Sequence, residues 1–179
     1  MIIWYNDCGD HMIRKANKND IKDIMKVVVS AQTFLKEEGV DQWQNNYPNE
    51  EVLIRDIDNK NLYVYELDDK VVGFCAIIFG IDVTYNKIYD GKWLGENNNY
   101  VTIHRIATLK EYRKHNIASE FVLYTKKLAQ ERNLESIRID THKDNIAMNS
   151  FLLKNGFVKC GIIYLLDGNE RLAYELIIK

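Results

Sequence analysis

Residues 104–133 read HRIATLKEYRKHNIASEFVLYTKKLAQERN and carry the clearest structural pattern in the chain. The stretch begins as an apolar strand, passes a short basic turn over residues 110–115, and continues as a helix. The apolar helix positions recur three or four residues apart, at Ile117, Phe121, Tyr124 and Leu128. The pattern predicts a strand, a basic turn and a helix in direct succession.

The basic turn contains Arg113, Lys114 and His115, immediately before the helix. The first N–H groups of a helix have no partner within the helix, and the helix dipole is positive at that end. Charge and geometry therefore both favour binding of an anion at this turn.

The same turn resembles the acyl-CoA-binding motif of the GNAT acetyltransferase superfamily, Q/R-x-x-G-x-G/A, in which the backbone holds the cofactor pyrophosphate. Here the motif reads Arg113-Lys114-His115-Asn116-Ile117-Ala118. Asn116 stands where the family usually has Gly, and Asn tolerates positive φ better than other residues with a side chain. The resemblance implies that acetyl-CoA is the co-substrate and is held by seven residues: Arg113, Lys114, His115, Asn116, Ile117, Ala118 and Ser119.

The chain has 179 residues, of which 46% are hydrophobic, and this suits one globular domain with a full core. We expect a single domain over residues 12–179 and an N-terminal extension over residues 1–11. The net charge is −2 and the basic residues are scattered, which disfavours nucleic acid and anionic membranes as partners.

Three cysteines, Cys8, Cys75 and Cys160, lie far apart, with no C-x-x-C and no His at zinc-ligand spacing. This disfavours both a disulfide framework and a metal site. No apolar run approaches the roughly 20 residues that span a bilayer, and the first eleven residues lack the pattern of a signal peptide. We expect a cytoplasmic protein without a metal.

The order of the expected elements follows from periodicity and turn residues. We expect strands at 12–16, 61–67, 70–79, 100–109, 136–142, 157–165 and 171–178, and helices at 21–28, 31–38, 49–59, 117–133 and 145–155. Residues 80–99 read as an irregular functional loop. The fold class is α+β (mixed α/β), and the order resembles that of the GNAT fold, a mostly antiparallel twisted sheet of about seven strands flanked by helices.

A second feature of the family falls in the helix at 145–155. Asn145 followed by Gly156-Phe157 is similar to the GNAT pattern N-x-x-A…G-F, whose Asn approaches the pantetheine arm. Met148 stands where the family has a small residue. Leu152 stands where many members have the Tyr that protonates the departing thiolate, so the usual acid is missing.

Acetyl transfer to an amine needs a group that accepts a proton and donors for the developing oxyanion. The resemblance implies that the thioester lies along Ile106-Ala107-Thr108 and that His104, just upstream, is the base. The alternative is that His104 is a buried packing residue. His142 is the rival base, because Asp140 on the same strand face could orient its ring. Two tyrosines could replace the missing acid, Tyr164 and Tyr174.

The acceptor side is expected in two irregular segments, an aromatic-bearing loop at residues 39–48 and the loop at residues 80–99, where aromatic faces can hold a cationic amine. The candidates are Trp43, Tyr47, Tyr85 and Trp93. The alternative is that these aromatic residues anchor loops onto the sheet.

The sequence therefore predicts an N-acetyltransferase that moves an acetyl group directly from acetyl-CoA to a primary amine of a small molecule or peptide. The alternative is a CoA-binding regulatory or interaction module with little or no turnover, motivated by Asn116 and Leu152. A general nucleotide-phosphate binder is disfavoured, because the sequence lacks the Gly-rich, Lys-containing motif of a P-loop. The acceptor and the oligomeric state are left open, a homodimer included.

Overall fold

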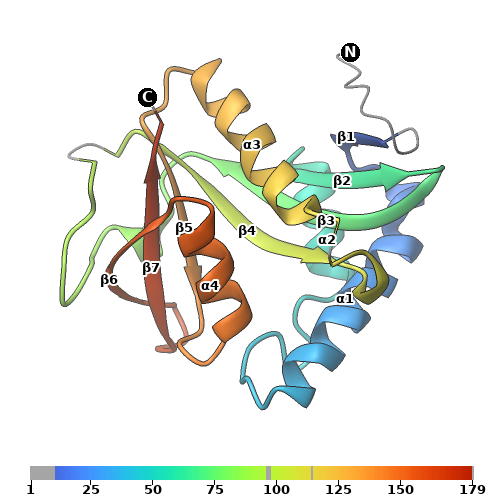
Figure 1. Cartoon of the computed structure of the whole chain (residues 1–179), viewed down its shortest axis with the longest axis horizontal. Coiled ribbons are helices and arrows are strands. Elements are labelled where there is room, and N and C mark those ends of the chain that lie inside the picture. Colours follow the sequence, from blue (N-terminus) through green and yellow to red (C-terminus); the bar gives the residue numbers. More distant parts are fainter. Residues whose placement is uncertain (1–10, 96–97, 114, 179) are drawn as a thin grey trace. The chain divides into compact units, whose positions relative to one another are not determined.

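Figure 1 shows the computed structural model, which describes residues 11–95, 98–113 and 115–178. These residues form one seven-stranded sheet with the strand order β1-β2-β3-β4-β5-β7-β6. The strands are β1 His11–Lys15, β2 Leu62–Leu67, β3 Lys70–Phe79, β4 Tyr100–Thr108, β5 Ser136–Thr141, β6 Val158–Tyr164 and β7 Glu170–Ile177. The α-helices are α1 Ile21–Glu37, α2 Glu50–Asp58, α3 Ile117–Gln130 and α4 Ile146–Lys154, and the short 3-10 helices are η1 Lys18–Asp20, η2 Val83–Tyr85 and η3 Lys110–Tyr112.

The predicted α+β fold with a seven-stranded sheet is confirmed. One prediction was wrong in the N-terminal region, where two helical pieces were expected and a single helix, α1, runs from Ile21 to Glu37. No Gly or Pro separates the two expected pieces, and the β-branched residues before Ser30 weaken a helix without ending it. The remaining helix and strand ends differ from prediction by a few residues.

The described residues form two compact units. Unit 1 contains the described residues up to Gly39, together with Trp43–Ile77 and Arg105–Phe121. Unit 2 contains the described residues of Val40–Gln42, Ile78–His104 and Val122–Lys179. The single domain expected over residues 12–179 stays a prediction. Residues 1–10 of the expected extension lie outside the described residues, whereas His11 begins β1.

The core of unit 1 packs α1 and α2 against one face of β2 and β3. In α1 the buried positions follow helical spacing, and in β2 the buried Val64 points to the same core. The buried residues of this core are Ile21, Ile24, Val27, Val28, Leu53, Ile57, Leu62, Val64, Val71, Phe74 and Ala76.

The other face of β2 and β3 in unit 1 meets the first turns of α3. Tyr65 alternates with Val64, and its ring contacts the edge of Phe121 with centroids 6.1 Å apart. Gly73, opposite Tyr65 in β3, leaves the space that Ile117 occupies, since a Cβ there would lie 3.1 Å from Ile117 Cγ2. This close approach fixes where α3 begins.

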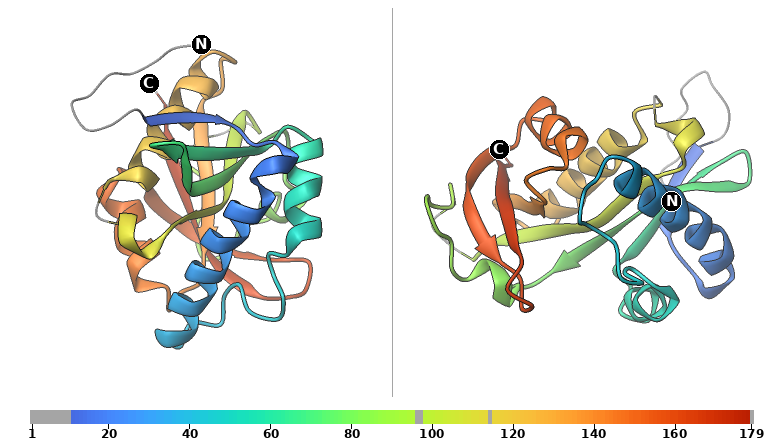
Figure 2. Two further views of the ribbon diagram at one scale, coloured as in Figure 1. Left: turned by 90° about the vertical axis from the view of Figure 1, so that its right-hand side faces the viewer. Right: turned by 90° about the horizontal axis from the view of Figure 1, so that it is seen from below.

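Unit 2 is built around the strands β5, β6 and β7. β7 pairs antiparallel with both β5 and β6, and Figure 2 shows β6 and β7 as a long hairpin. The segment between β3 and β4 was expected to be irregular, and it is, apart from η2 and a bridge between Tyr89 and Ile162. Gly161 permits this bridge, because a Cβ there would lie 2.5 Å from the Tyr89 carbonyl oxygen.

No helix in the described part of the chain is long and apolar enough to cross a membrane.

Candidate active site

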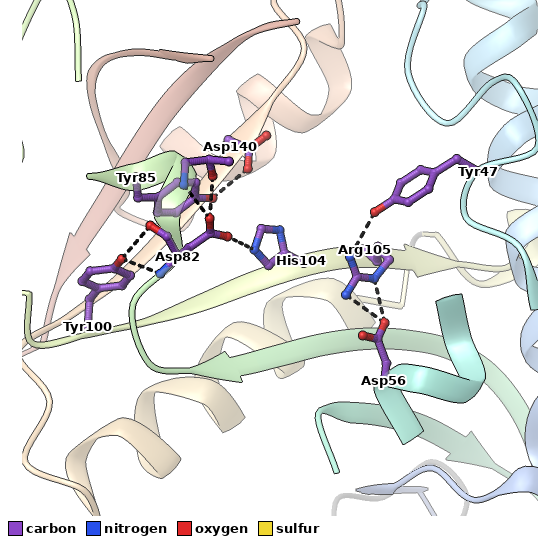
Figure 3. A network of polar contacts seen from close by, with 9 residues as sticks. Tyr47, Asp56, Asp82, Tyr85, Tyr100, His104, Arg105 and Asp140 are labelled. Atoms are coloured by element: carbon purple, nitrogen blue, oxygen red, sulfur yellow. Dashed lines mark hydrogen bonds and ion pairs between the residues drawn. The ribbon is translucent and has the colours of Figure 1, made fainter. Parts of the chain in front are cut away.

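His104 lies in the part of β4 that belongs to unit 2, with 19% of its side chain exposed. Its Nε2 atom lies 3.0 Å from Oδ2 of Asp82, a residue of the segment between β3 and η2 (Figure 3). The sequence predicted His104 as a candidate base, but it did not reveal this carboxylate partner.

Asp82 is held from its other side by Thr84. The backbone N–H and the hydroxyl of Thr84 both donate to Oδ1 of Asp82, at 2.9 and 2.6 Å. Burial opposes ionisation of Asp82, but hydrogen bonds from His104 and Thr84 outweigh it and lower the pKa of Asp82 to about 2. Asp82 is therefore a carboxylate at neutral pH.

Two tyrosines surround this pair in unit 2. The ring of Tyr85 lies 6.1 Å from the ring of His104, and its hydroxyl donates to Oδ1 of Asp140 at 2.7 Å. Burial and the nearby Asp140 raise the pKa of Tyr85 well above its ordinary value, so it remains a donor. The hydroxyl of Tyr100 accepts the backbone N–H of Asp82 at 3.0 Å. These contacts fix the Asp82 turn.

The pairing of β4 with β5 stops before His104. The two strands run parallel and pair over Tyr100–Thr102 with Ser136–Arg138. Between His104 and β5, both parts of unit 2, no further pair is found among the described residues. The backbone of β4 at His104 is thus not used in a ladder with β5.

Arg105, the next residue of β4, belongs to unit 1 and makes a separate network (Figure 3). Its Nη2 and Nε atoms lie 2.8 and 2.9 Å from Oδ2 of Asp56 in α2, and its Nη1 atom donates to the Tyr47 hydroxyl at 3.0 Å. Arg105 has φ 52°, a left-handed conformation that is costly for a residue with a side chain and interrupts the pleat of a strand. The ion pair with buried Asp56 holds it there.

The start of α3, also in unit 1, is the predicted anion site. Asn116 has φ 57°, as expected for a residue standing in a Gly position, and its carbonyl accepts the Glu120 N–H. Both His115 and Asn116 are exposed. The first N–H groups of α3 have no partner inside the helix. Lys114 lies outside the described residues.

Arg113 is directed toward α1 within unit 1. Its guanidinium carbon lies 4.0 Å from the centroid of the Phe34 ring, and Nη2 donates to the Ser30 carbonyl at 3.5 Å. Burial lowers the pKa of Arg113 from its ordinary value. The side chain packs on α1 as well as carrying charge near α3.

Comparison with known proteins adds the decisive observation. Residues 29–157 match the family model for the acetyltransferase (GNAT) family. The chain belongs to the GNAT family. A GNAT-family acetyltransferase from Streptococcus agalactiae 2603 is 34% identical, with a TM-score of 0.87, and the match covers 99% of each chain.

Two further solved structures share the GNAT fold. A proposed acetyltransferase from Staphylococcus aureus MU50 is 27% identical, with a TM-score of 0.71, over 94% of this chain and 99% of that one. The PaiA N-acetyltransferase from Thermoplasma acidophilum, solved in complex with coenzyme A, is 18% identical, with a TM-score of 0.70, over 94% and 99%. A search of curated protein sequences gave no match.

The GNAT motif residue Asn145 caps α4 in unit 2. Its Oδ1 accepts the Met148 N–H at 3.0 Å, and its Nδ2 donates to Oε1 of Gln42 at 2.9 Å. Leu152, where many GNAT members have Tyr, is fully buried. The hydroxyl of Tyr174 donates to Oδ1 of Asn149. Contact of Asn145 with a pantetheine arm stays a prediction.

His142 does not pair with Asp140 as the sequence suggested. Its Nδ1 atom accepts the Asp144 N–H at 3.2 Å, just after β5 ends at Thr141. Asp140 instead accepts the Tyr85 hydroxyl. The physical reason is that α4 begins soon after β5, so the chain turns over residues 142–145. The His142 ring accepts its hydrogen bond from within this turn.

The predicted acceptor residues have partners of their own. Trp43 packs on Phe74 in unit 1, with ring centroids 6.2 Å apart. Tyr47 is 42% exposed. In unit 2, Tyr85 is buried, and the indole N–H of Trp93 donates to its carbonyl at 3.0 Å. Whether these residues also touch an acceptor stays a prediction.

The residues predicted to lie along the thioester are half-buried and belong to unit 1; they are Ile106, Ala107 and Thr108. Ala107 packs against the core of that unit, and its carbonyl approaches Gly73. Within the described residues, no group of three or more His, Cys, Asp or Glu side chains is arranged to hold a metal ion.

Asp82, Thr84, Asp56 and Arg105 were missed by sequence reasoning. A signal for Asp82 was available, because Asp-x-Thr forms a local turn in which the hydroxyl and N–H of Thr bind the carboxylate. A signal for Asp56 was its position between Leu53 and Ile57 on the apolar face of α2. Neither signal identifies the distant partner.

Proposed function

We propose that this GNAT-family protein transfers an acetyl group directly from acetyl-CoA to a primary amine of a small molecule or peptide. The observation that carries the proposal is His104, partly exposed on β4 and hydrogen-bonded to the carboxylate of Asp82. An imidazole titrates near neutrality and suits the removal of a proton from an amine.

The residues at the start of α3 fit an acyl-CoA. The unpaired N–H groups of the first helical turn and the helix dipole suit a pyrophosphate. Asn116 adopts the left-handed backbone that the motif needs, and Gly73 lets the turn pack closely on β3. Coenzyme A bound to the Thermoplasma acidophilum neighbour supports the same ligand class here. Acetyl-CoA would supply the acetyl thioester.

The chain's own residues would prepare the acceptor. An alkylammonium with a pKa near 10 is almost wholly protonated at neutral pH, so it must lose a proton before it can attack. His104 would accept that proton, and one or more backbone N–H groups of the segment 106–108 would donate to the thioester oxygen. Trp43, Tyr47, Tyr85 and Trp93 remain the proposed acceptor side.

The test is release of free thiol from acetyl-CoA in the presence of a panel of amines. His104→Ala should lower kcat/KM roughly 10²–10⁴-fold, the usual contribution of a positioned base. His11→Ala is the control, because His11 of β1 stacks on Tyr65 of β2. This substitution should leave the rate unchanged.

Two outcomes would contradict the proposal. A large loss for His142→Ala with little loss for His104→Ala would move the base to the end of β5. CoA binding by calorimetry without thiol release for any amine would favour a regulatory CoA-binding module, a reading consistent with Leu152 in place of the family's Tyr.

A further inference from the structure

His104 has two ring nitrogens, and the structure distinguishes them. Nε2 lies 3.0 Å from Oδ2 of Asp82. Among the described residues, no hydrogen-bond partner is found for Nδ1. In a neutral imidazole one nitrogen carries the proton and the other offers a lone pair, and the hydrogen bond at one nitrogen decides the role of the other.

The carboxylate of Asp82 leaves one choice at Nε2. An ionised carboxylate only accepts hydrogen bonds, and the pKa of Asp82 of about 2 keeps it ionised at neutral pH. Nε2 must therefore carry the hydrogen. Oδ1 is already bound by the N–H and hydroxyl of Thr84, so Oδ2 is the oxygen that faces the ring.

We infer that Asp82 is a positioning residue that holds His104 in the Nε2–H tautomer, so that Nδ1 is the atom that accepts the proton of the acceptor amine. The inference rests on the proposed function for its catalytic part. The tautomer itself is a property of the resting protein.

The proton balance follows from this arrangement. An ammonium acceptor transfers one N–H proton to Nδ1, its N–H bond pair remains on the amine nitrogen, and the neutral amine can attack. His104 becomes an imidazolium, with both nitrogens protonated, and its charge lies against the Asp82 carboxylate. The amine nitrogen then bonds to the acetyl carbon while the C–S bond breaks, and coenzyme A leaves as the thiolate. The amide nitrogen gives its second surplus proton to water or to the departing thiolate. The imidazolium returns the first proton to water, which restores the starting tautomer.

Asp82→Asn gives a sharp test, because Thr84 dictates how the new amide lies. The Thr84 backbone N–H can only donate, so the amide oxygen must occupy the Oδ1 position. The NH₂ group then faces Nε2, which must become the acceptor. His104 would switch to the Nδ1–H tautomer, with no lone pair at Nδ1.

The tautomer is read by long-range ¹H–¹⁵N NMR on protein with ¹⁵N-labelled histidine. Spectra are recorded about two pH units above the ordinary histidine pKa of about 6.5, and the four histidines are assigned with a His104→Gln variant. We expect the wild type to show a protonated Nε2 and an unprotonated Nδ1, and Asp82→Asn to show the reverse.

Kinetics provide the second readout. Asp82→Asn should lower kcat roughly 10²–10⁴-fold, as expected when a base is held in the wrong tautomer, and should leave KM for acetyl-CoA within about threefold. Asp20→Asn is the matched control, because Asp20 also receives backbone and side-chain donors, from Asn17 and Arg14, but does not contact His104. It should lower thermal stability without changing the tautomer or kcat.

A wild-type spectrum with the Nδ1–H tautomer would overturn the inference, and this measurement needs no variant to fold. An Asp82→Asn protein with the wild-type tautomer and rate would also overturn it. If the wild type shows the expected tautomer but no amine is acetylated, the proposed function fails while the structural assignment stands.

Discussion

Cys75 and Cys160 are the two cysteines in the described part of the chain, and both are buried. Burial raises the pKa of the Cys75 thiol well above its ordinary value. Burial and the nearby charge of Glu175 raise the pKa of Cys160 to about 11. The thiolate is the nucleophile in acyl transfer to cysteine, so neither group is suited to carry an acetyl group at neutral pH. This supports the proposed direct transfer.

The chemical test at this scale uses a Cys8→Ser variant, which leaves only the two buried thiols. At pH 7 a thiol of pKa about 11 is ionised in about one molecule in 10⁴. We expect no rapid reaction of the native variant with a disulfide reagent such as DTNB, and two reactive thiols after unfolding in guanidinium. A native thiol that reacts within seconds and is protected by acetyl-CoA would contradict direct transfer.

At the scale of elements, the loop before β4 is tied to two strands of unit 2 by a buried ion pair. Arg138 of β5 and Glu175 of β7 lie opposite each other, with Nε 2.9 Å from Oε1 and exposures of 2% and 0%. The N–H groups of Leu94 and Gly95 donate to Oε2. The Arg138 guanidinium lies over Trp93, 4.2 Å from its ring centroid, and also contacts Tyr100. Trp93 thus has a loop-anchoring role whatever its role toward an acceptor.

Glu175→Gln should destabilise the protein severely. It leaves the buried Arg138 without a counter-charge, and breaking a buried pair in this way costs about 3–5 kcal/mol. Urea unfolding measures the loss. The control is Glu170→Gln, an exposed position at the start of the same strand, which should change the free energy of unfolding by less than about 0.5 kcal/mol. A loss below about 1 kcal/mol for Glu175→Gln would mean that the loop is held by other contacts.

At the scale of the whole molecule, a ligand that binds only the folded state raises the free energy of unfolding. At a concentration 100 times its Kd the gain is about 2.7 kcal/mol. For a chain of this size such a gain corresponds to a rise in Tm of about 5–10 °C. We expect coenzyme A to produce this shift in a thermal unfolding experiment, with inorganic pyrophosphate at equal ionic strength producing much less.

The variant for this experiment is Ser119→Glu, in the first turn of α3. A carboxylate there repels a pyrophosphate but interacts favourably with the helix dipole, so the helix itself is not weakened. The unliganded Tm should stay the same or rise, and the shift caused by coenzyme A should be lost. An equal shift in wild type and variant would show that coenzyme A binds elsewhere.

The fold was largely predictable because the signals that specify its elements are local. Apolar positions three or four residues apart predicted α3 and most of α1, and alternation predicted β2 and β5. The two helical pieces expected at 21–28 and 31–38 are one helix, and no Gly or Pro lies between them to end it. The left-handed backbone at Asn116 was also foreseeable, because Asn tolerates positive φ. The left-handed conformation of Arg105 was not, because nothing local favours it there.

The sequence by itself predicted the order and type of the elements, apart from the division of α1, and it made the turn before α3 a candidate anion site and His104 a candidate base. Only the tertiary structure decided which groups meet: Asp82 binds His104 across 22 positions, Asp56 binds Arg105 across 49, and Asp140 binds Tyr85 rather than His142. The physical reason is range. Periodicity and capping depend on neighbours along the chain, whereas a hydrogen-bonded pair depends on where folding brings two distant side chains together.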